Sequence, residues 1–215
     1  MPPQKKEWRT LKVAGIYLAA GQNRRPAART SMPAIRENTS GSAAVSELER
    51  CGLEPLVVVV RAGDRLEWLP TGREQGNVRT ETCLTAHLGL SFSLRCGLNA
   101  VLPLQPDAVI IAQADQPYIT ASIVSRLMET FERSPELDYV SSAAEGAGMP
   151  TALYSKVMFP ALAEMDDDGG AAGILHSADY KGVVLPVVSP MGFWEEGICK
   201  DTREFTALWS ERNIK

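Results

Sequence analysis

One loop in the sequence combines small residues with cations, as a site for a nucleoside triphosphate would. The apolar run 13–20 leads into this loop, which begins with Leu18, Ala19, Ala20 and Gly21. Small side chains after a buried strand let backbone N–H groups approach a base or a phosphate. Three arginines that could neutralise a triphosphate follow: Arg24, Arg25 and Arg29. A tight turn without a ligand also explains the small residues.

A carboxylate occupies a second position of this kind. Asp115 follows the apolar run 108–112 and precedes Thr120, a residue type that favours the N-cap of a helix. Mg²⁺ prefers oxygen ligands and commonly bridges a carboxylate to a phosphate. Asp115 could therefore hold a magnesium ion, although a loop or capping role would also explain it.

Alternating strands and helices position these residues. We expect strands at 13–20, 56–60, 77–82, 108–112, 137–141, 151–154 and 182–187. We expect helices at 39–51, 90–101, 120–131, 160–165, 169–177 and 203–212. This order predicts a mainly parallel sheet covered by helices on both faces, a three-layer α/β/α fold. Ligands of such sheets bind beyond the carboxyl ends of the strands, where the loop at Gly21 and Asp115 both lie.

Composition narrows the class of protein. The chain has 215 residues, of which 45% are apolar and 22% charged, and we expect one domain at 13–215 after a polar extension at 1–12. The net charge is −4, which offers no long-range attraction for nucleic acid or an anionic membrane. No apolar run is long enough to cross a bilayer, and the start of the chain is polar, so we expect a cytoplasmic protein. Four widely spaced cysteines without a C-x-x-C pair indicate reduced thiols.

The first loop resembles a known signature. Residues 15–25, GIYLAAGQNRR, resemble the start of LAAGxSxRMGxxK in the molybdenum-cofactor cytidylyltransferases. These enzymes belong with the MobA-like NTP transferases, which include PucB-type accessory proteins of xanthine dehydrogenase. Pro26 and Ala27 replace the Met-Gly pair of the signature. Direct counting puts Thr30 at its phosphate-binding lysine, whereas alignment on Pro33 puts Arg29 there.

The resemblance assigns roles to the residues of this loop and implies a Rossmann-like nucleotidyltransferase fold. The implied nucleotide-binding residues are Leu18, Ala19, Ala20, Gly21 and Arg24. The implied catalytic residues are two cations, Arg25 and Arg29, and the carboxylate of Asp115. An arginine at the lysine position keeps the charge but presents a planar fork.

Two acidic segments resemble the metal-binding motifs of the same family. The sequence AQADQP around Asp115 resembles the ADQP motif. The sequence DDDGGAA resembles GDxGAR, with Asp168 as the metal-binding aspartate and Ala172 in place of the arginine. The resemblance implies that Asp115 and Asp168 bind one Mg²⁺ during nucleotidyl transfer. As the alternative, Asp168 would cap the helix expected at 169–177.

Two further segments resemble substrate-binding parts of the family. GLSFSLRCGL resembles GMSSSLxxGL, which implies that Ser91 and Ser93 lie beside the nucleotide base. Capping of the helix at 90–101 is the alternative role for these serines. The turn at 148–150 resembles the G-x-P turn beside the pterin site, which implies acceptor contacts from Gly148 and Pro150. A Gly-Pro turn also forms without a ligand.

The resemblance implies transfer of a cytidylyl group from CTP to molybdopterin. The pair Ala19-Ala20 favours CTP, because guanylyl enzymes of the family tend toward Ala-Gly-Gly. The expected partners are the nucleotide, the pterin and the apoenzyme of a molybdenum hydroxylase in purine catabolism, with no nucleic acid or membrane. The departures at Pro26, Ala27, Thr30 and Ala172 support an alternative, a catalytically impaired homologue that acts as a cofactor-binding chaperone. Another small acceptor is a further alternative.

Overall fold

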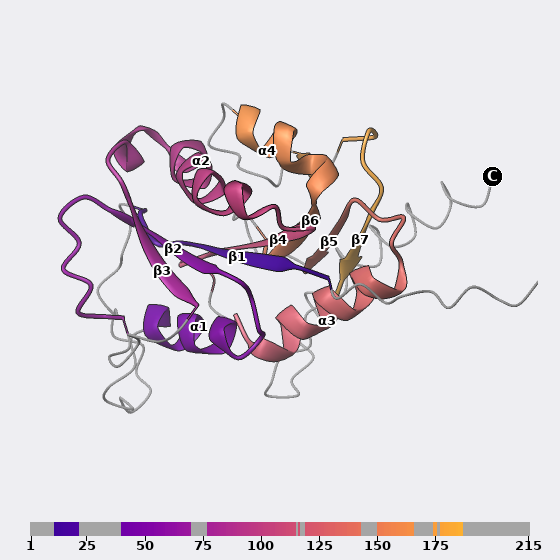
Figure 1. Cartoon of the computed structure of the whole chain (residues 1–215), viewed down its shortest axis with the longest axis horizontal. Coiled ribbons are helices and arrows are strands. Elements are labelled where there is room, and N and C mark those ends of the chain that lie inside the picture. The colour runs from indigo at the N-terminus through magenta and orange to yellow at the C-terminus, as the bar shows by residue number, and fades with distance from the viewer. Residues whose placement is uncertain are drawn as a thin grey trace, which may run out of the picture.

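The molecule is built on one mixed sheet with helices on both faces (Figure 1). The computed structural model describes residues 11–21, 40–69, 77–114, 116, 119–142, 150–165, 174–175 and 177–186. The strands are β1 (Val13–Leu18), β2 (Leu56–Arg61), β3 (Val78–Cys83), β4 (Ala108–Gln113), β5 (Tyr139–Ser142), β6 (Ala152–Ser155) and β7 (Gly182–Leu185). The helices are α1 (Ser40–Glu49), α2 (Leu90–Val101), α3 (Ala121–Arg133) and α4 (Phe159–Glu164).

The strand order is β3-β2-β1-β4-β6-β5-β7. Neighbours from β3 to β4 are parallel, β6 is antiparallel to both β4 and β5, and β5 is parallel to β7. The predicted three-layer α/β/α fold with a mainly parallel sheet is thus confirmed. Because the chain moves from β1 to β2 on one side and later to β4 on the other, the strand order reverses at β1. Such a switch point is where open α/β sheets bind ligands.

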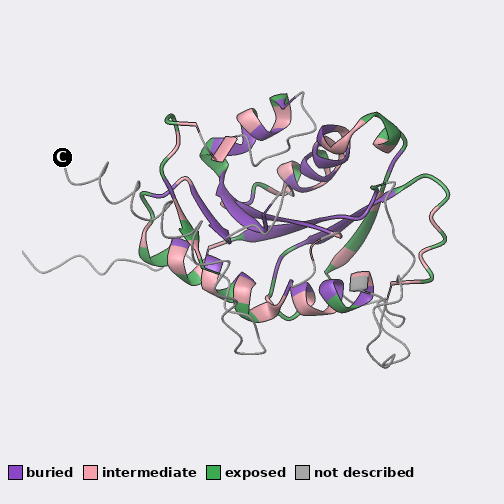
Figure 2. Ribbon diagram, turned by 180° about the vertical axis from the view of Figure 1, so that it is seen from behind, coloured by how far each residue is buried: buried purple, intermediate pink, exposed green. Residues whose placement is uncertain are grey.

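Burial of the central strands follows from their apolar sequences. Every residue of β1 and β4 is buried, because helices cover both faces of the sheet (Figure 2). Helices α2 and α4 cover one face and α1 and α3 the other (Figure 1). Gly97 lets α2 approach the sheet closely, since a Cβ there would lie 2.5 Å from Cγ2 of Ile16. Within the described ranges, none of the helices combines the length and apolar character needed to cross a bilayer.

Helix α1 is attached to α3 by polar contacts at their ends. The carboxylate of Glu47 accepts the backbone N–H of Ala121 at 2.9 Å, and the Cys51 thiol faces the carbonyl oxygen of the same residue at 3.8 Å. Thr120 is the N-cap of α3, as its sequence position predicts, and its hydroxyl accepts the N–H of Ile123 at 3.3 Å. The start of α3 is therefore held by its own cap and by α1.

Most expected elements occur within two residues of their predicted bounds. The first strand ends at Leu18, two residues earlier than expected. The N–H of Ala19 still bonds to the carbonyl of Val59 at 2.8 Å, after which the chain leaves the sheet. Of the helix expected at 169–177, only residues 174 and 175 are both described and helical, and the helix expected at 203–212 lies outside the described residues.

Candidate functional site

The strands β1 to β4 end at one side of the sheet, which we call the carboxyl-end rim. Its described residues are 18–21, 113, 114, 116, 150 and 151 and the N-terminal turn of α2. The N–H of Ala114 bonds to the carbonyl oxygen of Leu18 at 3.0 Å, so the exits of β4 and β1 are joined. This pair of adjacent strand ends is the place where the fold predicts a ligand.

The small residues after β1 pack inward. Leu18, Ala19 and Ala20 are buried, with Ala19 on the α1/α3 face and Ala20 on the α2/α4 face. Gly21 is exposed, and a Cβ placed there would meet nothing within 4 Å. The methyl groups thus fill the core of the turn, while open space begins at Gly21. This arrangement is compatible with both the tight turn and the nucleotide loop considered from the sequence.

Gln116 ties the end of β4 to the start of β6. Its Oε1 atom accepts the hydroxyl of Thr151 at 2.6 Å and the backbone N–H of Gln113 at 3.3 Å. The carbonyl of Thr151 in turn accepts the N–H and the hydroxyl of Ser142, both at 2.9 Å. The segment predicted to bind metal and the one predicted to bind the acceptor, whose Pro150 is buried, therefore lie side by side.

The N-terminal turn of α2 contributes the two predicted serines. Ser91 and Ser93 are 2% and 4% exposed, so protein encloses both. The N-cap of α2 is Gly89, with φ of 145° and no side-chain capping bond, so neither serine caps this helix. A φ in this region favours glycine, which explains why the helix begins directly after that residue. A place beside a nucleotide base stays the predicted role of these two hydroxyls.

Sequence reasoning missed two residues that organise this rim. The sequence pattern identifies Gln116 only as part of the ADQP motif and Arg95 only as part of the segment that forms α2. Arg95 lies one helical turn after Ser91, and helical side chains point back toward the N-terminus, so the spacing could have placed it at the rim. Its Nη2 atom donates to the carbonyl oxygen of Met165, at the end of α4, at 3.1 Å.

The remaining predicted site residues lie outside the described part of the chain: Arg24, Arg25, Arg29, Asp115, Gly148 and Asp168. Among described residues, no group of three potential ligands from His, Cys, Asp and Glu could hold a metal ion. The described neighbours Ala114 and Gln116 place both sides of position 115 at the carboxyl-end rim. The carboxylate of Asp115, by its chemistry, is the kind of oxygen ligand that a hard divalent cation prefers.

Two described thiols are poor nucleophiles. Burial raises the pKa of Cys96 on α2 to about 11, with smaller contributions from Cys83 and Glu81. Burial also raises the pKa of Cys51 to about 11, with a smaller contribution from Glu47. Since the thiolate is the reactive form, both side chains are protonated and inert near neutral pH. A reaction through a cysteine adduct at these positions is therefore disfavoured.

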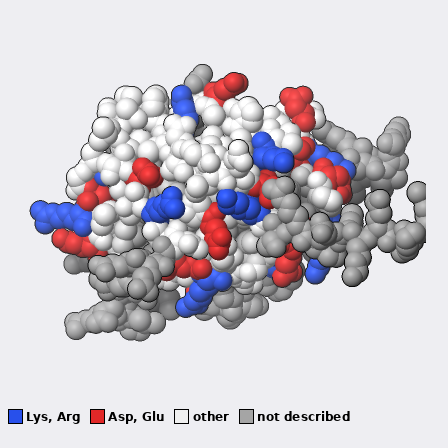
Figure 3. Space-filling view, in the orientation of Figure 1, with Lys and Arg blue, Asp and Glu red and all other residues white. Residues whose placement is uncertain are grey.

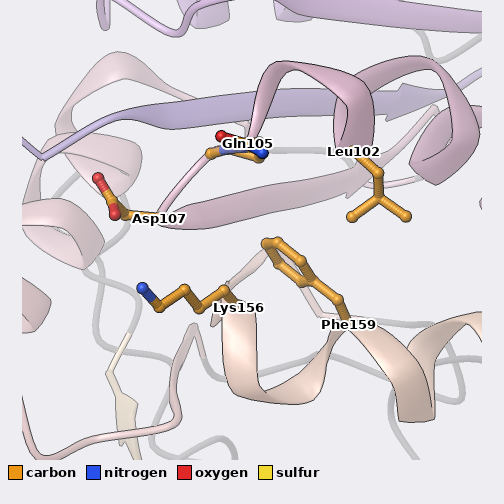
Figure 4. A pocket seen from close by; sticks show the side chains of 6 residues that line it. Leu102, Gln105, Asp107, Lys156 and Phe159 are labelled. Atoms are coloured by element: carbon orange, nitrogen blue, oxygen red, sulfur yellow. The ribbon is translucent and has the colours of Figure 1, made fainter.

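A pocket of about 350 Å³ lies at the opposite side of the sheet, which we call the amino-end rim. Its lining residues are Leu102, Gln105, Pro106, Asp107, Lys156 and Phe159 (Figure 4). They precede β4 or follow β6, and β6 runs antiparallel to β4, so the pocket lies where β4 begins. It is thus separated from the carboxyl-end rim by the length of the strands.

Charges are interspersed on the face seen in Figure 3. Lysines and arginines alternate with aspartates and glutamates there, without a broad patch of one sign. Such a surface gives no electrostatic footprint for nucleic acid on this face.

Fold and rim together define an α/β protein of the nucleotidyltransferase type. Residues 15–182 match the family model of the MobA-like NTP transferase domain, and the chain belongs to this family. The purine catabolism protein PucB of Bacillus subtilis is 27% identical over 177 residues, which cover 80% of this chain and 84% of PucB. The family resemblance drawn from the sequence motifs is therefore confirmed.

Solved structures show the same fold. A nucleotidyl transferase from Methanothermobacter superposes with a TM-score of 0.63 at 18% identity, covering 84% of this chain and 89% of that one. Rv0371c from Mycobacterium tuberculosis, in a complex with manganese, gives a TM-score of 0.60 at 20% identity, covering 82% of this chain and 88% of that one. At such identities the likeness concerns the fold, and function has to be argued from the site.

Proposed function

We propose that this protein transfers a cytidylyl group from CTP to molybdopterin, in a step that matures the cofactor of a xanthine dehydrogenase-type enzyme. The observation that carries the proposal is the 2.6 Å hydrogen bond between Thr151 and Gln116. It holds the segment of Asp115 against the segment of Pro150, as a reaction between a metal-bound nucleotide and a pterin requires. The similarity to PucB, a purine catabolism protein, supports the physiological setting.

The chain's own residues would share the work as follows. Backbone N–H groups near Gly21 would bind the nucleotide, and the three arginines of the following loop would neutralise its phosphates. Asp115 and Asp168 would hold a divalent cation, which supplies charge neutralisation at the α-phosphate when bound. The manganese complex of the M. tuberculosis relative supports this expectation.

The reaction joins the terminal phosphate of molybdopterin to the α-phosphorus of CTP. The bond between the α- and β-phosphates breaks, and pyrophosphate leaves with its charge stabilised by fixed cations. Gln116 and Thr151 would act by keeping the two substrates in register, since orientation alone can supply much of the acceleration of a two-substrate reaction. Arg29 would take the place of the signature lysine, as the alignment on Pro33 puts it.

A second function is favoured by a specific observation, the replacements at Pro26, Ala27, Thr30 and Ala172. A chain that has lost the signature lysine and arginine could bind the cofactor or the apoenzyme without turnover. In that case the protein would act as a chaperone of a molybdenum hydroxylase.

Calorimetry with CTP and Mg²⁺, followed by a pyrophosphate-release assay with molybdopterin, separates the two functions. We expect CTP binding and pyrophosphate release, and loss of release in Asp115→Asn with CTP binding retained. Binding without release would favour the chaperone. A panel of nucleoside triphosphates and sugar phosphates tests for another acceptor, and release with GTP instead of CTP would overturn the cytidylyl assignment.

A further inference from the structure

The strand β3 forms one edge of the sheet. It stands last in the strand order, and its strand partner among the described residues is β2 alone (Figure 1). The register of this pair runs without interruption along all six residues of β3, so no bulge bends the strand away from a further neighbour. Arg79, Thr80 and Thr82 are exposed. An unpaired edge of this kind is a template for pairing with another strand.

The hydrogen bonds to β2 determine which backbone groups of β3 point outward. The carbonyl oxygen of Asn77, just before the strand, accepts the N–H of Leu56 at 3.0 Å, so the backbone of Asn77 faces β2. Backbone groups alternate in direction along a strand, and the other odd-numbered residues of β3 therefore face β2 as well. The N–H and C=O groups of Val78, Thr80 and Thr82 point away from the sheet, where no described strand pairs with them.

The side chains of β3 carry a self-complementary pair of charges. Arg79 and Glu81 lie on the same face of the strand, because side chains alternate between the two faces. Cys83, two positions further on, packs into the core between the sheet and helices α2 and α4, which identifies this face. Within the part of the chain that the structure describes, neither Arg79 nor Glu81 forms an ion pair.

An antiparallel pair of two β3 strands, centred on Thr80, matches both patterns. Thr80 lies opposite Thr80 of a second copy, and the two residues exchange N–H···O=C bonds because their backbone groups point outward. Arg79 then lies opposite Glu81 of the second copy, in a pair without backbone hydrogen bonds, where side chains approach most closely. Opposite charges at facing positions stabilise an antiparallel pair, whereas like charges destabilise it. The symmetry of the pair produces this favourable contact twice.

We propose that β3 is a dimerisation strand, through which two copies of this chain join edge to edge around a twofold axis at Thr80. The two seven-stranded sheets then form one continuous sheet. Because β3 is parallel to β2, β1 and β4, antiparallel pairing turns the carboxyl-end rims of the two copies in opposite directions. Neither rim is covered by this pairing, so the inference goes beyond the proposed function and does not depend on it. The competing interpretation is an edge that its charges keep solvated and unpaired.

The test reverses the two charges and measures self-association of the full chain by sedimentation equilibrium over a range of concentrations. One strand pair makes a small interface, so we expect a weak dimer whose population rises with concentration. Arg79→Glu and Glu81→Arg each place like charges opposite one another twice, and each should weaken the dimer by about 10- to 100-fold. The double reversal restores opposite charges and should recover association. A mixture of the two single variants should also associate, because each supplies the charge that the other lacks.

Amide hydrogen exchange followed by NMR locates the contact. The outward N–H groups of Thr80 and Thr82 should exchange more slowly as the dimer forms, whereas the N–H of Arg79, which faces β2, should change little. Arg133→Glu is the matched control, since it alters the net charge as Arg79→Glu does, but at an exposed position of α3. It should leave the dimer unchanged. Thermal unfolding of each variant verifies that it is folded.

The outcomes separate this inference from the proposed function. A dimer that both single reversals leave intact would overturn the inference, because another surface would then join the copies. A chain that stays monomeric at millimolar concentration would also overturn it: free exchange at Thr80 would indicate a solvated edge, and protection at Thr80 an edge covered by its own chain. Pyrophosphate release should be equal in all variants. Its absence throughout would count against the proposed transfer alone, and the association measurements would still decide the role of β3.

Discussion

The two rims of the sheet are both cross-linked by hydrogen bonds, but the bonds join different kinds of segment. At the amino-end rim, the carboxylate of Asp107 accepts the N–H of Lys12 at 3.1 Å, and its carbonyl oxygen accepts the N–H of Lys156 at 3.0 Å. These residues flank strands of the sheet itself. At the carboxyl-end rim, Gln116 bonds to Thr151 and Arg95 bonds to Met165. Thr151 follows the predicted acceptor-binding turn in the sequence, and Met165 precedes the acidic segment that contains Asp168.

This difference shows that a pocket alone does not locate the function. The pocket of the amino-end rim has a volume within the range of small-molecule sites. The hydrogen bonds around this pocket, however, connect residues that flank strands of the sheet. The pocket also lies where β4 begins, away from the carboxyl ends of the parallel strands. The carboxyl-end rim has the strand ends, the switch in strand order and the loops, which is where an α/β sheet of this kind places its chemistry.

The strongest test of the comparison removes one hydroxyl from the carboxyl-end rim. Thr151→Val keeps the shape of the side chain but deletes the donor to Gln116, so the metal and acceptor segments lose their link. If the segment of Asp115 binds the metal as proposed, we expect pyrophosphate release to fall by about 10- to 100-fold, the loss typical when a residue that orients a metal ligand is replaced. Thr82→Val, at an exposed position of β3, is the control and should retain activity. Equal rates for both variants would show that the bond between Thr151 and Gln116 does not contribute to turnover.

A second test acts on the helix that spans both rims. In Gly97→Ala the added methyl would lie 2.5 Å from Cγ2 of Ile16 and 3.1 Å from Cγ2 of Val59, so α2 must shift outward. We expect the free energy of unfolding, measured in urea, to fall by about 1–3 kcal/mol, as is usual for overpacking. Gly21→Ala, with open space around its Cβ, should leave stability unchanged. A stable Gly97→Ala protein would indicate that α2 is not packed as tightly as described.

The fold was predictable because its signals are local. Uniform apolar runs such as those of β2 and β4 read as buried strands, and Thr120 was identified as an N-cap from residue type and position. The antiparallel setting of β6 was not predictable, since sequence pattern does not fix strand direction. The bonds of Gln116 and Arg95 were not predictable either, because their partners are 35 and 70 positions away in the sequence and become neighbours only in the folded chain.

A third test addresses the amino-end rim. Lys156→Gln removes the only lysine lining the described pocket and should leave pyrophosphate release unchanged. The side chain is exposed, so the change in unfolding free energy should stay within about 1 kcal/mol. A tenfold loss of turnover would instead show that the amino-end pocket contributes to the reaction, and the functional difference between the two rims would be wrong.

The smallest expected effect concerns the half-buried thiols of Cys51 and Cys96. Burial raises the pKa of Cys51 and of Cys96 to about 11, so their thiolate forms are scarce at neutral pH. Iodoacetamide labelling followed by mass spectrometry should be slow for both at pH 7 and should accelerate as the pH rises toward 11. The urea-unfolded chain, with ordinary thiols, provides the reference rate. Rapid labelling of folded Cys96 at pH 7 would reveal a reactive group on α2.

The contact between Glu47 and the first residue of α3 bears on how this family can diversify. Since α1 is anchored by its own end to α3, its place in the framework does not depend on the sequence that connects it to β1. This contact does not involve the connecting sequence, so it can hold α1 against α3 even where that sequence changes.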